Sequence, residues 1–411
     1  MRRDMATREP SVELLQLTLD AVTRFNGVIA HASRYLGHPA NTVKGRYHKA
    51  LDKGMKPSRE DWDDDLSVIT KDEQIASLKT QIKQMRADRL DQNFIKEKLY
   101  KLRDSDIQVP DWLLKSPSNR NVTGVPTLFA SDWHWGEVVE QSQINNVNEY
   151  NLSIARRRAN MMISATVDIL KNRFHNPRYE GIVFALGGDM VSGDIHEELS
   201  ATNEIEIMPT VIDLFGILCW CIETLADEFS NVFVPCVTGN HGRNTYKIRN
   251  KGRTYTSFDW LTYHFLAKRF EMDSRVKFLI PDGADAYYTV YNHKYLLTHG
   301  DQFRGGDGII GALFPILRGD SKKRTRNAQI NYEYDTMILG HWHQLIQLQR
   351  CIVNGSLKGY DEYAYTNNFP FEPPRQALWI THPEHGITFS TPVNVDKQPK
   401  KISRGWVSWK E

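Results

Sequence analysis

Cysteine is scarce in this chain, and no two cysteines form a Cys-x-x-Cys pair. The 411 residues contain four of them, Cys219, Cys221, Cys236 and Cys351. So few cysteines without paired spacing exclude a disulfide framework and a cysteine-based zinc site. We therefore expect reduced thiols in the core of a cytoplasmic protein.

The chain also lacks a long hydrophobic run and a large charge of one sign. Its most apolar stretch, 211–229, is interrupted by Asp213, Glu223, Asp227 and Glu228, so we expect no membrane partner. The N-terminus carries no apolar signal-peptide core, which predicts no secretion. The net charge is only +2, but Lys and Arg outnumber Asp and Glu before residue 60 and again within 318–326. This uneven distribution is a better indicator of anionic partners than the total.

What the sequence does contain is a series of metal-binding side chains, each after a short apolar run. The series is Asp132-Trp133-His134, Gly188-Asp189, Gly239-Asn240-His241, His299-Gly300-Asp301 and Gly340-His341-Trp342-His343. The apolar runs predict five buried strands of an α/β fold. Because ligand sites of such folds collect at the carboxyl ends of strands, we expect these side chains to meet at one edge of a sheet.

The residue types in this series indicate a particular chemistry. Carboxylates, imidazoles and an amide carbonyl bind Mn, Fe, Zn and similar divalent ions, and a carboxylate can bridge two ions. Two ions about 3.5–4 Å apart would hold a phosphoryl group and lower the pKa of a bound water. The series therefore predicts hydrolysis of phosphoesters.

The order D-x-H, GD, GNH, H, GHxH resembles that of the calcineurin-like metallophosphoesterases, whose members include DNA-repair nucleases, and the resemblance covers roughly residues 125–390. It implies a four-layer α/β/β/α sandwich with a dinuclear centre, most often manganese, with Fe, Zn, Mg or Ni as alternatives. By this resemblance Asp132, His134 and His343 would hold the first metal, Asn240, His299 and His341 the second, and Asp189 would bridge them. His241 matches the family's catalytic histidine.

The chain departs from the family pattern at two places. Gly242 and Arg243 follow His241, where the family often has an acidic residue that orients the histidine. Arg243 could instead bind a substrate phosphate through its planar guanidinium. Ser192 stands where many members have Asp or Asn, and Asp194 either replaces it or is simply solvated.

Residues 1–60 form a separate unit with three predicted helices, 12–25, 28–36 and 42–51, broken at Gly27 and Gly37. This spacing resembles a helix-turn-helix. Its third helix would present a polar and basic face suited to phosphates and base edges of DNA: Asn41, Thr42, Lys44, Arg46, His48 and Lys49. The alternatives are a three-helix bundle with a solvated basic face and a protein-binding module.

A charged helical connector, 61–120, follows this unit, and a catalytic domain, 121–395, and a tail, 396–411, complete the chain. Within the connector, 71–103 has an apolar stripe at near-heptad spacing, which would suit either a homodimer or packing along the catalytic domain. Arg304 and the basic segment 318–326 are candidate substrate contacts. Ordinary basic residues at a surface helix end are the alternative.

Three functions fit these patterns. The first is a metal-dependent DNA nuclease or phosphodiesterase, in which the N-terminal helices supply affinity for DNA. The second is a phosphatase or nucleotide phosphodiesterase with a small substrate. The third is a DNA-binding regulatory protein with an inactive phosphoesterase fold, although all seven ligand positions and His241 are intact. The fusion of these parts suggests a phage origin and hence the host cytoplasm.

Overall fold

The computed structural model describes residues 10–25, 27–58, 109–115, 123–303 and 313–396. The chain divides into two compact units, residues 1–105 and 106–411. The predicted connector helix, Arg304 and the C-terminal tail lie outside the described residues. The possibility of a homodimer through 71–103 therefore stays a prediction.

Among its described residues, 10–25 and 27–58, the N-terminal unit contains three helices, α1 (Val12–Arg24), α2 (Ile29–Leu36) and α3 (Ala40–Asp52). The Ser11 hydroxyl accepts a hydrogen bond from the Leu14 amide at 3.3 Å and so caps the start of α1. Gly37 ends α2 in the left-handed conformation with φ of 65°, which a glycine adopts without strain. Small apolar clusters join the helices, and their buried members are Leu15, Leu19, Ala21, Val22, Ala32, Val43 and Ala50.

The second unit contains two sheets. The first has the strand order β11-β10-β1-β2-β3-β4. Its strands are β1 (Val125–Ala130), β2 (Ile182–Leu186), β3 (Val232–Pro235), β4 (Val276–Leu279), β10 (Arg375–His382) and β11 (Gly386–Asn394). Strands β1 to β4 are parallel, and the hairpin of β10 and β11 is added at the β1 side in antiparallel pairing.

The second sheet has the order β5-β6-β7-β9-β8. Its strands are β5 (Asp285–Val290), β6 (His293–Thr298), β7 (Thr336–Leu339), β8 (Ile346–Leu348) and β9 (Cys351–Val353). The five motif strands are therefore β1, β2 and β3 of the first sheet and β6 and β7 of the second. The expectation of a single sheet edge was wrong, because a strand that is buried on both faces has the same apolar pattern in either sheet.

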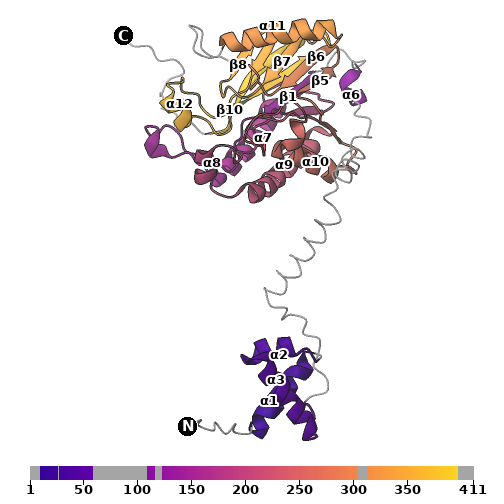
Figure 1. Cartoon of the computed structure of the whole chain (residues 1–411). Coiled ribbons are helices and arrows are strands. Elements are labelled where there is room, and N and C mark those ends of the chain that lie inside the picture. The colour runs from indigo at the N-terminus through magenta and orange to yellow at the C-terminus, as the bar shows by residue number, and fades with distance from the viewer. Residues whose placement is uncertain (1–9, 26, 59–108, 116–122, 304–312, 397–411) are drawn as a thin grey trace, which may run out of the picture. The chain divides into compact units, whose positions relative to one another are not determined.

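Three apolar cores hold these elements together. One packs α7 (Leu152–Asn172), α9 (Ile207–Phe229) and α10 (Phe258–Arg269) on one face of the first sheet. A second joins the two sheets through residues such as Phe129, Tyr295 and Trp379. A third lies between the second sheet and α11 (Leu313–Gln329), which Figure 1 shows along the outer face of β6, β7 and β8. Shorter helices complete the unit: α6 (Asp111–Leu114), α8 (Glu197–Thr202) and α12 (Glu362–Thr366).

Helix α9 is the one helix, among the residues that the structure describes, long and apolar enough to cross a membrane by length and composition. One of its faces packs into the core through Leu214, Leu218, Ile222 and Leu225. Its apolar character on that face is what a helix covering a sheet requires.

Candidate metal centre

The residues predicted as metal ligands occupy tight loops at the ends of their strands. Five of the seven have a positive φ: Asp132 at 55°, His134 at 48°, Asp189 at 49°, His341 at 70° and His343 at 51°. Asp and His are among the few residue types that tolerate this left-handed conformation, which still costs roughly 1 kcal/mol or more per residue. These five residues lie where the chain leaves β1, β2 and β7.

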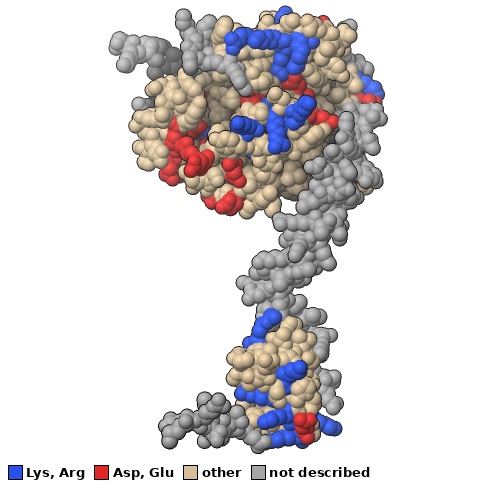
Figure 2. Space-filling view, viewed as in Figure 1, with Lys and Arg blue, Asp and Glu red and all other residues tan. Residues whose placement is uncertain are grey.

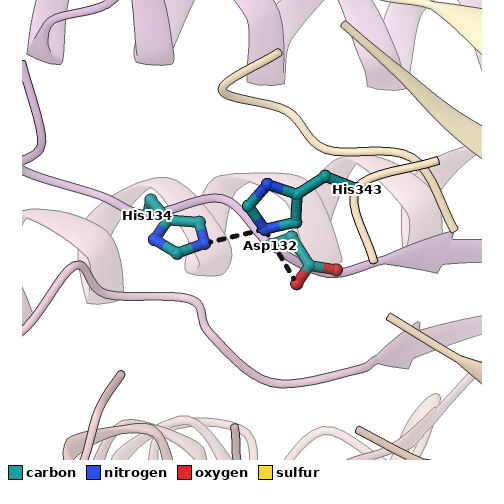
Figure 3. Close-up of side chains that lie close together, drawn as sticks. All are labelled: Asp132, His134 and His343. Carbon is teal, nitrogen blue, oxygen red and sulfur yellow. Dashed lines mark hydrogen bonds and ion pairs between the residues drawn. The ribbon is translucent and has the colours of Figure 1, made fainter. Parts of the chain in front are cut away.

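The first group consists of Asp132, His134 and His343 (Figure 3). The Nε2 atoms of His134 and His343 lie 3.1 Å apart, and the Nε2 atom of His343 lies 3.5 Å from Asp132 Oδ1. Two ligand atoms on one metal ion, each with a bond of about 2.1 Å, are separated by roughly 3.0–3.4 Å. The spacing and the donor types of this group therefore fit a divalent ion.

The second group consists of Asp189, His299 and His341, with Asn240 beside it. The His299 Nε2 atom lies 2.9 Å from Asp189 Oδ2 and 3.2 Å from the amide oxygen of Asn240. Burial opposes the charged form of His299, but the carboxylates of Asp189 and Asp132 outweigh it and raise its pKa to about 10. A bound metal ion would have to displace that proton.

Asp189 connects the two groups. It also clusters with His134 and His241, and the ligand atoms within each cluster lie within 4.8 Å of one another. Its side chain is almost fully buried. Asp189 is therefore the residue that could contact ions in both groups.

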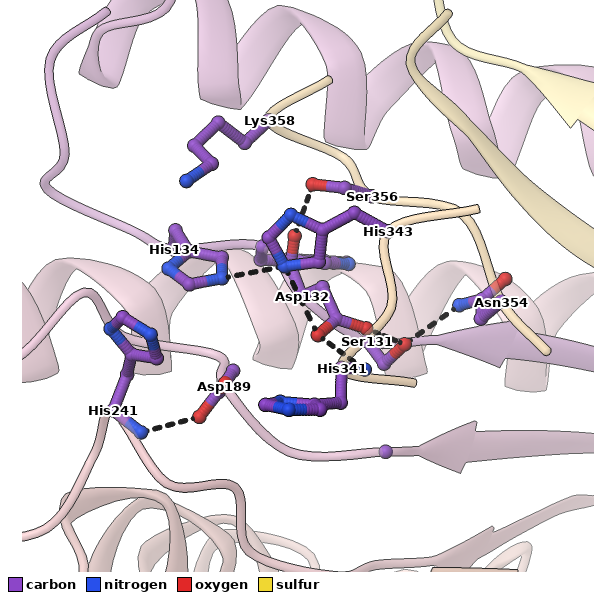
Figure 4. Close-up of polar contacts among 12 residues, drawn as sticks. Ser131, Asp132, His134, Asp189, His241, His341, His343, Asn354, Ser356 and Lys358 are labelled. Atoms are coloured by element: carbon purple, nitrogen blue, oxygen red, sulfur yellow. Dashed lines mark hydrogen bonds and ion pairs between the residues drawn. The ribbon is translucent and has the colours of Figure 1, made fainter. Parts of the chain in front are cut away.

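His241 lies beside Asp189 and His134 (Figure 4), with its ring 4.6 Å from that of His134. The His241 amide donates a hydrogen bond to Asp189 Oδ1 at 2.6 Å, and its ring Nδ1 lies 3.2 Å from the carbonyl oxygen of Ser192. Burial lowers the pKa of His241 to about 3. A backbone carbonyl thus takes the place of the acidic residue that the family often uses, and a main-chain partner leaves no signature in the sequence.

A buried ion-pair network lies beside the Nδ1 atom of His134, on the side of the ring opposite His343. The Nδ1 atom of His134 lies 3.1 Å from Glu137 Oε2, and Lys358 Nζ lies 2.7 Å from Glu137 Oε1 and 2.6 Å from Asp361 Oδ2. The two carboxylates raise the pKa of Lys358, and Lys358 lowers the pKa of Glu137 and of Asp361. All three groups therefore stay charged although they are buried. Such a partner fixes the orientation of a ligand histidine.

Two further sets of contacts join the motif loops, and the sequence did not indicate the first of them. Asp259, fully buried in the first turn of α10, accepts hydrogen bonds from the amides of Asp189, Met190 and Gly239 at 2.9–3.2 Å. Burial raises its pKa to about 6. Beside β1, the Asn354 amide donates to the Ser131 hydroxyl at 2.9 Å, and the Ser356 hydroxyl donates to the Asp132 carbonyl at 2.8 Å.

Arg243 and three basic residues of α11, which were predicted to contact the substrate, pair with other groups of the protein. The guanidinium of Arg243 donates to the backbone carbonyls of Asn240, Thr245 and Tyr246, so it braces its own loop, and its contact with phosphate stays a prediction. Asp194 is exposed. In α11, Lys323 and Arg326 pair with Asp285, and Arg324 pairs with Asp320, which favours the alternative of ordinary basic residues for these three.

The predicted DNA-binding residues lie on one helix of the N-terminal unit. Asn41, Thr42, Lys44 and Lys49 are exposed on α3, and Arg46 is half-buried. Figure 2 shows more Lys and Arg than acidic residues on the visible face of this unit. The surface agrees with the predicted face, and its binding of DNA stays a prediction.

Among the comparisons with known proteins, only the comparison with solved structures found matches. No protein-family profile and no curated protein matches the chain. A single mutant of Vps29 from Entamoeba histolytica is 12% identical, with 65% of this chain and 98% of that chain covered at a TM-score of 0.27. Vps29 from Cryptosporidium parvum is 12% identical (66% and 97%, TM-score 0.28), and a conserved Streptococcus pneumoniae TIGR4 protein, described as a predicted phosphoesterase, is 9% identical (66% and 98%, TM-score 0.26).

The chain resembles the calcineurin-like metallophosphoesterases in its five ordered motifs, and the structure brings the motifs together at one centre. The case for metal chemistry rests on those side chains.

Proposed function

We propose that this protein is a metal-dependent phosphodiesterase with a dinuclear centre, and that its substrate is DNA. The observation that carries the proposal is the position of Asp189, which belongs both to a group with His134 and to a group with His299 and His341. A buried carboxylate shared by two sets of imidazoles is the arrangement that a two-metal phosphoesterase needs. The three apolar cores agree with the four-layer sandwich of the family.

In this proposal Asp132, His134 and His343 would hold one ion, Asn240, His299 and His341 would hold the other, and Asp189 would be a ligand common to both sets. Such ions, with manganese the first choice, would when bound supply Lewis acidity for a phosphoryl oxygen and for a water. His241 contributes the polar group that faces the reacting phosphate. Its ring is held by the Ser192 carbonyl on one side and stands against the His134 ring on the other, so it can stabilise charge on a phosphoryl or leaving oxygen.

The N-terminal unit supplies affinity for DNA in this proposal. Its exposed residues on α3 combine amide, hydroxyl and ammonium groups, which suit base edges and phosphates. The regulatory alternative uses the same surface but requires an inactive centre. Every predicted ligand is present in the structure and clustered, which supports the enzyme.

The test is a substrate panel with the full-length protein and added Mn²⁺. Plasmid, linear and single-stranded DNA are incubated beside bis(p-nitrophenyl) phosphate and p-nitrophenyl phosphate. We expect cleavage of DNA and of the diester, and loss of both with a chelator. Hydrolysis of small esters with every DNA intact would overturn the DNA proposal, and absence of any hydrolysis with each divalent metal would overturn the enzyme.

A further inference from the structure

A loop of unusual composition leaves the metal centre directly after His241. Residues 243–257 contain five cations, Arg243, Lys247, Arg249, Lys251 and Arg253, and no acidic residue. Residues 246–252 are all exposed. Within this stretch the cations alternate with Tyr246 and Ile248. The loop is therefore positively charged and partly apolar at the same exposed surface.

The base of the loop is fixed to the centre. Arg243 and Ser257 form a backbone bridge, the Phe258 amide donates to the Gly242 carbonyl at 2.7 Å, and the Asn244 amide donates to the Thr256 carbonyl at 2.7 Å. Gly252, with φ of 62°, turns the chain back. Tyr246 follows His241 by five residues, so their Cα atoms lie within about 18 Å of each other.

Two of the five cations serve as anchors. The guanidinium of Arg243 donates to backbone carbonyls, and Arg253 pairs at 2.8 Å with Asp301, two residues after the ligand His299. The loop is thereby tied to the segments that carry Asn240 and His299. Its tip cannot move far from the centre while these contacts hold.

The other three cations have a different environment. In the part of the chain that the structure describes, no acid pairs with Lys247, Arg249 or Lys251. Three neighbouring cations without acidic partners repel one another, and a polyanion relieves that repulsion while releasing its counterions. A phosphate backbone leading to the metal centre fits this charge.

The aromatic residues of the loop narrow the choice of polyanion. Tyr246 is 85% exposed, and Tyr255, whose ring stands edge-on against Trp260 at 5.5 Å, is 47% exposed. An exposed ring gains little from the paired bases inside a duplex, whereas an unpaired base can stack on it. Aromatic residues interleaved with cations are typical of surfaces that bind single strands.

We propose that the 243–257 loop binds a single-stranded segment of nucleic acid, with Lys247, Arg249 and Lys251 on its phosphates and Tyr246 stacked on a base. This inference rests on the proposed function, because the strand it holds is the substrate of the adjacent centre. The chemistry is shared by single-stranded DNA and RNA, and the test includes both.

The test measures binding to the full-length protein in a chelating buffer, where no cleavage occurs. The probes are fluorescent oligothymidylate and oligouridylate of about 15 nucleotides and a duplex of equal length. With Lys247→Gln, Arg249→Gln and Lys251→Gln combined, single-strand affinity should fall at least about 10-fold at low salt, and the slope of log affinity against log salt should become shallower by about 2. Tyr246→Ala should weaken single-strand binding about 10-fold and duplex binding less.

A matched control removes two lysines and one arginine that are exposed on other elements: Arg178→Gln, Lys277→Gln and Lys294→Gln. This control should bind the oligonucleotides as the unaltered protein does. Wild-type affinity and salt slope in the loop variant would overturn the inference, and so would an equal loss in the control. Equal weakening of duplex and single strand by Tyr246→Ala would assign the loop to duplex DNA instead. Hydrolysis of bis(p-nitrophenyl) phosphate by the unaltered protein tests the proposed function separately.

Discussion

The candidate metal centre and the N-terminal helices differ in how the side chains proposed for function are held. At the centre, Asp132, Asp189 and His299 are almost fully buried, and each contacts several other groups of the site. On α3, Lys44 and Lys49 extend into solvent from a helix whose own core is small. One site is fixed by packing, whereas the other is a surface that a partner would have to order.

This difference explains why the sequence indicates the metal-ligand series more clearly than the DNA-binding face. A metal centre admits few residue types, and each must follow a strand end, so its members appear in the sequence as an ordered series. A DNA-binding face requires only polar and basic residues on one side of a helix, a pattern that solvated helices also have. Three changes, from the largest expected effect to the smallest, test this contrast.

The first change is Asp189→Asn, which removes the carboxylate shared by the two ligand groups. Loss of the shared ligand should weaken stabilisation of the transition state, so hydrolysis of bis(p-nitrophenyl) phosphate should fall about 100- to 1,000-fold. Metal content, measured by mass spectrometry, should fall with it. The exposed Asp194→Asn is the matched control and should retain both. Full activity in Asp189→Asn would show that the centre is not the site of hydrolysis.

The second change is Lys358→Met, which leaves Glu137 and Asp361 buried without their counterion. Breaking a buried ion pair from one side should lower the free energy of unfolding by about 3–5 kcal/mol, and the freed Glu137 should weaken metal affinity about 10- to 100-fold. Urea unfolding and metal titration measure these effects. Lys171→Met removes an exposed pair with Glu228 and should cost less than about 1 kcal/mol. Equal effects of the two changes would contradict the distinction between a packed site and a surface.

The third change is Lys44→Gln with Lys49→Gln on α3. If both lysines contact phosphates, the slope of log affinity for duplex DNA against log salt should become shallower by about 2. The unfolding transition should hardly move, because exposed substitutions change stability by less than about 0.5 kcal/mol each. Lys53→Gln with Lys56→Gln, exposed just beyond α3, is the control. An unchanged salt slope in the α3 variant would show that the two lysines do not contact DNA phosphates. It would favour the alternative of a three-helix bundle with a solvated basic face.

The residues that the sequence predicted as metal ligands lie together in the structure, and their role as ligands stays a prediction; the residues that support them were not predicted. The three N-terminal helices and the strand-end ligands follow from periodicity and residue type. Asp259 was missed because it binds backbone amides, which any sequence provides. Lys358 was missed because Glu137, the partner that links it to His134, lies 221 residues away in the chain. The carbonyl that orients His241 is equally invisible. The single sheet edge was wrong because apolar runs do not specify which sheet a strand joins.

The left-handed conformation of five ligand residues bears on how this protein would change over generations. A metal ion would require the side chains of these residues, whereas the turns require their left-handed backbone. A mutation can remove the first requirement and leave the second. If the centre hydrolyses phosphoesters as proposed, a descendant without this activity would no longer need Asp or His at positions 132, 134, 189, 341 and 343, but the loops would still turn there. Glycine and asparagine relieve such turns best, so their accumulation at these positions would record a lost activity.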